Sequence, residues 1–219
     1  GDFLQGVAVG RWHGDALTVA LSWHKDESGV QALQVPANPS TQPWHWQRLT
    51  TTTQHEALSS GDIDRDGDLD LLLGTVWLRN DGPGQWQPLT LHTTTAKPDR
   101  NRLVDLNGDG RLDAVVGYEA ISKPGLVAWY EQGVDPTAPW REHQIATVTG
   151  PMSLDVADLD EDGDPDLAVG EHNLANPAAA ALYVFENSDG LGNGWRQYLV
   201  QHGDENHDGA QLVDIDGDG

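Results

Sequence analysis

The sequence predicts an all-β protein built from a repeated unit of four short strands. Three observations carry this prediction: an acidic motif that recurs along the chain, aromatic residues that recur with it, and the absence of any ten-residue segment with helical periodicity. Each motif runs directly into a short apolar segment that ends in glycine, as strands bounded by turn residues do.

The acidic motif has the pattern D-h-[DN]-x-D-G-x-x-D-h-h-h-G, where h is an apolar residue. It occupies residues 62–74, 105–117 and 158–170, and 214–219 begins a fourth copy. Two carboxylates about 4 Å apart repel by about 1 kcal/mol in water and by about 4 kcal/mol near a protein surface. A folded chain with this motif therefore needs something that offsets the repulsion, and a bound cation would do so.

Other features recur with the motif. One tryptophan opens an alternating segment in each unit, and a second aromatic residue marks another strand; fixed repetition of this kind predicts packing between units. The first set is Trp46, Trp86, Trp140 and Trp195, and the second is Trp23, Trp77, Trp129 and Phe185. Each unit contains four β-like segments, which in the best-defined copy are 153–158, 166–171, 181–187 and 195–201.

Four strands in about 40–55 residues are typical of one blade of a β-propeller. The units resemble the FG-GAP/VCBS repeats of integrin-α-like β-propellers, and the acidic motif with its three apolar residues and glycine carries the resemblance. It implies an all-β fold, a β-propeller of four-stranded blades with calcium loops between the first and second strands. The chain would hold about four blades' worth of a seven- or eight-bladed ring.

The repeat divides the chain into blade-sized units. We expect a partial blade with three strands over 1–55, blades over 56–98, 99–151 and 152–207, and the first strand of a further blade over 208–219. From this division we expect the chain to be one segment of a longer propeller. The alternative is a closed four-bladed ring in which the terminal strands complete one blade.

The acidic loops suit a hard divalent cation held by oxygen atoms. Side chains at positions 1, 3, 5 and 9 and the main-chain carbonyl at position 7 are the expected ligands, and the glycine at position 6 permits the turn. Arg111 at position 7 supports a main-chain role there. The expected ligands are Asp62, Asp64, Asp66, Asp68 and Asp70; Asp105, Asn107, Asp109, Arg111 and Asp113; Asp158, Asp160, Asp162, Asp164 and Asp166; and Asp214, Asp216 and Asp218 of the incomplete copy.

Calcium is favoured over magnesium, because the ligands are many, flexible and all oxygen. An EF-hand is excluded, since its glutamate at position 12 is replaced by Leu73, Val116 or Val169. A single such segment could equally be a solvated turn rich in aspartate and glycine. Three full copies favour a structural Ca²⁺, about one for each intact loop.

Composition limits the class of partner. The chain has 35 acidic and 12 basic residues and a formal charge of −23, which argues against binding to nucleic acid. No apolar run is long enough to span a membrane. The chain has no cysteine. With calcium usage and the family resemblance, this is consistent with a secreted or cell-surface protein, bacterial extracellular or periplasmic.

Ligand candidates are expected on the face opposite the acidic loops, which would include residues 11–18. Trp12, His13, His55 and Tyr118 are the candidate ligand-binding residues, because an exposed tryptophan stacks on the apolar face of a sugar. His172 and His207 each adjoin a carboxylate residue and are the candidate catalytic bases.

Three functions remain open. The first is a non-catalytic, calcium-stabilised module that binds carbohydrate or another surface ligand. The second is the propeller of a sugar-active enzyme, similar to polysaccharide lyases or to the aldos-2-ulose type of dehydratase, in which His172 or His207 abstracts a proton. The third is a purely structural domain beside a catalytic one. Convergence of His13, His55, His172 and His207 on one pocket would favour the enzyme.

Overall fold

The computed structural model describes residues 4–12, 14–25, 27–54, 57–206 and 209–214. These residues form four antiparallel sheets of four strands each, with the strands of every sheet in chain order. The all-β prediction and the four-stranded blades are confirmed. A short 3-10 helix, η1 (Pro177–Ala179), lies in the connection between two strands of the last sheet.

The four sheets are four successive blades. Blade 1 contains β1 (Leu4–Gly10), β2 (Thr18–Trp23), β3 (Val30–Gln34) and β4 (His45–Thr50). Blade 2 contains β5 (Ser59–Gly61), β6 (Asp70–Leu72), β7 (Val76–Asn80) and β8 (Trp86–Thr90). Blade 3 contains β9 (Pro98–Val104), β10 (Asp113–Tyr118), β11 (Pro124–Glu131) and β12 (Arg141–Thr149). Blade 4 contains β13 (Pro151–Ala157), β14 (Asp166–Glu171), β15 (Ala181–Asn187) and β16 (Trp195–His202).

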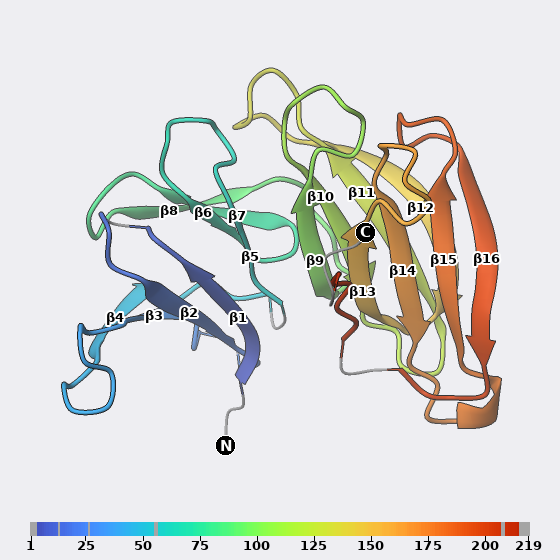
Figure 1. Ribbon diagram of the computed structural model, residues 1–219, viewed down its shortest axis with the longest axis horizontal. Coiled ribbons are helices and arrows are strands. Elements are labelled where there is room, and N and C mark those ends of the chain that lie inside the picture. Colours follow the sequence, from blue (N-terminus) through green and yellow to red (C-terminus); the bar gives the residue numbers. More distant parts are fainter. Residues whose placement is uncertain (1–3, 13, 26, 55–56, 207–208, 215–219) are drawn as a thin grey trace.

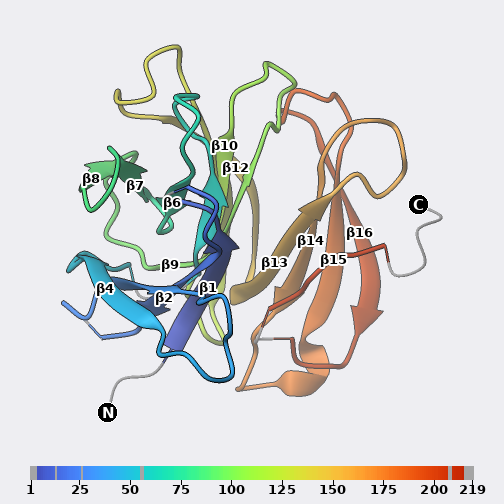
Figure 2. The same ribbon diagram turned by 60° about the vertical axis from the view of Figure 1, so that its left-hand side comes forward.

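The blades fan out around a common centre (Figure 1). The first strands of successive blades contact one another, β1 with β5, β5 with β9, and β9 with β13, whereas β4 and β16 lie at the outer ends of the fan. The acidic loops join the first strand of blades 2, 3 and 4 to the second, as predicted. In blades 3 and 4 they lie at the same end as the connection between β15 and β16, while the connection that carries η1 lies at the opposite end (Figures 1 and 2).

The hydrophobic core lies between the blades. Leu71 of β6 and Leu73, the residue after it, face blade 1, whereas Leu72 between them faces blade 3. This alternation makes both faces of a second strand apolar, which explains why these short segments are apolar throughout. Each of the three interfaces forms its own cluster of buried side chains.

A side-chain amide latches each blade to the one before it. The third strand of a blade ends at Asn80 or Asn187, or is followed by Gln132. The side-chain nitrogen of this residue donates to a carbonyl in the preceding blade's first loop, at 2.9–3.1 Å, and all three residues are buried. The acceptors are the carbonyl oxygens of Trp12, Ile63 and Leu106.

Blade 1 differs from the sequence prediction, because residues 4–50 form four strands rather than three. The segment 7–10 resembles a second strand in sequence, but it belongs to the first strand β1, and 30–34 supplies the third strand that was missed. The described residues of the connection between β1 and β2, 11–12 and 14–17, therefore join a first strand to a second, which places them at the end of the blades that carries the acidic loops. All four strands of blade 1 are contiguous in sequence, so the terminal segments do not combine into one blade.

The repeated tryptophans pack between blades, with two corrections. Trp77, Trp129 and Trp140 are at most 3% exposed within the interface clusters, and Trp86 and Trp195 pack against them. Trp46 is 50% exposed, because no described blade covers its face of blade 1. Trp23 lies on a second strand, and Phe185 faces blade 3; the true equivalents of Trp77 on the third strands are Ala32, Trp129 and Val184.

The C-terminal residues 209–214 form no strand in the described part of the chain, although a first strand was predicted there. They lie along the first strands of blades 3 and 4: Leu212 donates its amide to Asp155 on β13, and Ala210 accepts from Arg102 on β9. None of the described helical segments has the length and apolarity that a membrane span requires.

Candidate metal-binding loops

The three acidic loops share one backbone conformation. Glycine at position 6 has a positive φ in each loop, 97° at Gly67, 82° at Gly110 and 98° at Gly163. Position 4 is also left-handed, which the sequence prediction missed. It is Gly108 in the second loop, but Arg65 and Glu161 adopt φ near 60° in the others, where a side chain costs about 1–2 kcal/mol.

Side chains at odd positions turn inward and accept the loop's own amides. The carboxylate at position 1 accepts from the amide at position 6, at 3.1 Å for Asp62, 2.7 Å for Asp105 and 2.9 Å for Asp158. The side chain at position 5 accepts from the amide at position 7 in the same way in all three loops. These bonds gather the carboxylates on the inner side of the turn.

The carboxylate at position 9 is a structural clamp. One oxygen of Asp113 accepts the amide of Leu106 at 3.1 Å, and the other accepts the amide of Gln132 at 2.9 Å. Asp70 and Asp166 make the equivalent pairs of bonds in their loops. Position 9 therefore ties its loop to the end of the third strand, and each oxygen keeps a second lone pair for a metal.

The first and third loops fit a cation by their donor groups. Carboxylate oxygens of Asp62, Asp64 and Asp66 lie within 4.8 Å of one another, as do those of Asp158, Asp160 and Asp166. Oδ1 atoms of Asp62 and Asp64 are buried without a hydrogen bond. A buried carboxylate oxygen without a partner is costly, and a hard cation with oxygen ligands would satisfy it.

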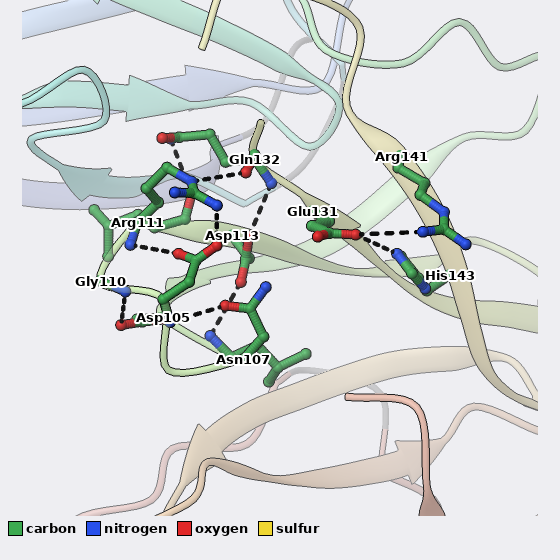
Figure 3. Close-up of polar contacts among 12 residues, drawn as sticks. Asp105, Asn107, Gly110, Arg111, Asp113, Glu131, Gln132, Arg141 and His143 are labelled. Carbon is green, nitrogen blue, oxygen red and sulfur yellow. Dashed lines mark hydrogen bonds and ion pairs between the residues drawn. The ribbon is translucent and has the colours of Figure 1, made fainter. Parts of the chain in front are cut away.

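The second loop contains its own competing cation. The guanidinium of Arg111 pairs with the carboxylate of Asp109. It also donates to the carbonyl of Gln132 at 3.0 Å (Figure 3). Oδ1 of Asp105 is nevertheless buried without a hydrogen bond. The sequence assigned Arg111 a main-chain role alone, whereas its side chain neutralises one of the predicted ligands.

Burial perturbs the clamping carboxylates. Desolvation raises the pKa of Asp70 and of Asp113 from 3.8 to about 7, and the hydrogen bonds from backbone amides only partly oppose this. Desolvation, with repulsion from Asp66, also raises the pKa of Asp64. Metal-free loops therefore hold protons more tightly in the folded chain than in the unfolded chain.

This gives a prediction for the pH dependence of stability. Because the folded pKa exceeds the unfolded pKa, the penalty for burying the charged carboxylates is full above pH 7 and is relieved as the pH falls toward 4. In the presence of a chelator, the melting temperature should rise as the pH is lowered from 8 to 5. Replacing both residues by asparagine, Asp70→Asn with Asp113→Asn, should flatten this profile in thermal denaturation. A profile of unchanged slope in that double variant would contradict the assignment.

The other predicted site residues do not form one pocket in the described part of the chain. Tyr118 is 2% exposed, with its hydroxyl bonded to that of Tyr130, and His172 is 4% exposed, with Nδ1 bonded to Glu205. Trp12 is 2% exposed rather than at the surface, although it lines a cavity. His13, His55, His207, Asp216 and Asp218 lie outside the described residues.

The four sheets identify the chain as a β-propeller. In three of its blades an acidic loop joins the first strand to the second. Residues 105–169 match the family described as FG-GAP-like repeat. This match and the four blades together support an FG-GAP β-propeller family for the chain. The comparison with curated proteins found no match.

Proposed function

We propose that the chain is a calcium-stabilised, extracellular propeller module that binds a carbohydrate or another surface ligand without catalysis. The observation that carries the metal part is the first loop, where carboxylate oxygens of Asp62, Asp64 and Asp66 lie within 4.8 Å of one another and the Oδ1 atoms of Asp62 and Asp64 are buried without a hydrogen bond. In this proposal Ca²⁺ binds among these oxygens and fixes the first hairpin of a blade, so its role is structural.

The extracellular assignment is supported by the metal and by composition. Millimolar calcium occupies about half or more of even weak sites outside the cell, where dissociation constants of about 10⁻⁴–10⁻³ M suffice. The chain has no cysteine, so metal ions would stabilise its loops where other secreted proteins use disulfides. Bound calcium would also neutralise part of the charge of −23.

The non-catalytic assignment is supported by the position of the candidate base. His172 is buried against Glu205 and has little access to a polysaccharide chain. A binding module needs a preformed surface, and the apolar interfaces between blades supply a rigid one.

The test is a pull-down on insoluble polysaccharides of neutral and uronic-acid type, in millimolar calcium and again in excess chelator, with mass spectrometry of the supernatant. We expect retention on at least one polysaccharide in calcium, weaker retention in chelator, and no new product. Release of unsaturated or dehydrated sugars would replace this proposal with an enzyme. Equal retention in both conditions would contradict the role of calcium.

A further inference from the structure

The interface between blades 1 and 2 lacks the third-strand tryptophan that the other two interfaces contain. On the third strand, Trp77 in blade 2 and Trp129 in blade 3 face the following blade and are 0% and 1% exposed. The equivalent residue of blade 1, paired with the same position of the second strand, is Ala32. Because Ala32 is small, blade 1 leaves space at the position that a tryptophan side chain fills in blades 2 and 3.

Part of that space is taken by a larger loop residue. Trp12 is the equivalent of Ile63 and Leu106 in the following blades. The carbonyl of each of these three residues accepts from the latch amide of the next blade. The remaining cavity has a volume of about 150 Å³ and lies between β3 and β4 of blade 1 and Trp86 of blade 2. A cavity of about this volume holds one six-membered ring.

The walls and the rim of the cavity differ in chemistry. Trp12, Trp86 and Leu49 supply apolar surface, and Trp12 is held in place because Nε1 donates to Oγ of Ser60 at 3.2 Å. The rim carries Gln34, His45 and Gln47, whose side chains make no hydrogen bond within the part of the chain that the structure describes. Indole surface beside available amide and imidazole groups suits a ligand that is apolar on one face and polar at its edge.

The charge of the lining selects among such ligands. Among the residues that the structure describes, no aspartate, glutamate, lysine or arginine lines the cavity, although the chain as a whole carries a charge of −23. A lining without cations in a strongly acidic protein disfavours a uronate or another anion, because the surrounding field repels it. A neutral pyranose meets both requirements, with its C–H face against an indole and its hydroxyls on the glutamine amides.

We propose that this cavity binds one pyranose ring of a neutral saccharide. The proposal rests on the proposed function as a carbohydrate-binding module and assigns its site. It places the site at the end of the blades that carries the acidic loops, because Trp12 lies between a first and a second strand. The ring occupies the volume that the indole of Trp77 or Trp129 fills in the other blades.

The experiment titrates the whole chain, in millimolar calcium, with a panel of methyl glycosides of neutral hexoses. The readout is the ¹H–¹⁵N signals of the tryptophan indoles, in which Trp12 and Trp86 should shift. Ala32→Leu fills the cavity and should weaken binding by about tenfold or more, which corresponds to about 1.4 kcal/mol. Ala138→Leu makes the same change at an exposed loop residue and should bind like the parent chain.

A second variant keeps the test valid if Ala32→Leu distorts the blade. Trp12→Ile with Ala32→Trp reproduces the residues that fill the next interface, so it should fold and bind no glycoside. Binding that survives in both cavity variants would overturn this site while leaving a carbohydrate-binding function elsewhere on the chain. Failure of every neutral glycoside to bind the parent chain would overturn this site, whereas the pull-down on neutral and uronic-acid polysaccharides decides the proposed function separately.

Discussion

Removal of calcium should lower the melting temperature of the chain by about 10–20 °C. A ligand held at a hundred times its dissociation constant stabilises the folded state by about 2.7 kcal/mol per site. The first and third loops each contain a carboxylate cluster, so two sites together contribute about twice that amount. For a chain of this length, about 1 kcal/mol corresponds to about 2–4 °C. Thermal denaturation in about 10 mM calcium, a hundred times a dissociation constant of about 10⁻⁴ M, and in excess chelator measures the difference.

Single substitutions assign the effect to individual loops. Asp62→Ala and Asp158→Ala should each remove about half of the calcium-dependent increase, because each removes the carboxylate at position 1 of one loop. Asp15→Ala, at an exposed aspartate outside the loops, should leave the increase unchanged. Arg111→Gln should strengthen calcium binding at the second loop, since it frees the carboxylate of Asp109. Equal melting temperatures with calcium and with chelator would refute calcium stabilisation.

The strands of blades 2 to 4 could be predicted from the sequence because several local signals coincide in each of these blades. Each of these blades has an acidic loop, an apolar second strand and a tryptophan that opens or precedes the fourth strand. Blade 1 has no acidic loop, so its apolar segment 7–10 was assigned to the wrong strand. That single shift also moved Trp12 to the wrong end of the blades, and with it the expected position of a ligand site.

Other features of the loops were less accessible to sequence reasoning. The left-handed conformation at position 4 is hidden because Arg65 and Glu161 are not residues that favour it. Position 9 is aspartate in all three full copies, but so are positions 1 and 5, so its identity alone does not mark the clamp. Its hydrogen bonds reach the end of the third strand, 10–21 residues away, and only the folded blade reveals them.

The cavity between blades 1 and 2 follows from a comparison of the repeats in three dimensions. Aligning third strands by their tryptophans placed Trp23 beside Trp77, which concealed the alanine at the true equivalent position. The asparagine or glutamine latch gives the correct alignment, because it lies three residues after Trp77, Trp129 and Val184 alike. A repeat is therefore aligned more safely on its hydrogen-bonded residues than on its largest ones.

Substitution of the clamp in blade 3, Asp113→Ala, should destabilise the chain by about 2–6 kcal/mol. It leaves the amides of Leu106 and Gln132 without acceptors, and each buried donor without a partner costs about 1–3 kcal/mol. Gln132 also latches blade 3 to the carbonyl of Ile63 at 2.9 Å, so its displacement loosens the interface with blade 2. Chemical denaturation at pH 8 in saturating calcium measures the loss.

Asp113→Asn distinguishes the hydrogen bonds from the charge. Asparagine keeps one carbonyl acceptor and removes the buried charge, so its loss of stability should be smaller than that of Asp113→Ala. The difference between the two variants should not change with pH, because neither has a titratable group at position 113; only the comparison with the parent chain, whose Asp113 pKa is raised to about 7, should depend on pH. Asp15→Ala again serves as the exposed control, and a loss in Asp113→Ala no larger than in this control would show that the clamp contributes nothing. Equal losses in Asp113→Asn and Asp113→Ala would instead assign the stabilisation to the carboxylate charge and its metal. The carbonyl acceptor that asparagine keeps and alanine lacks would then have no effect.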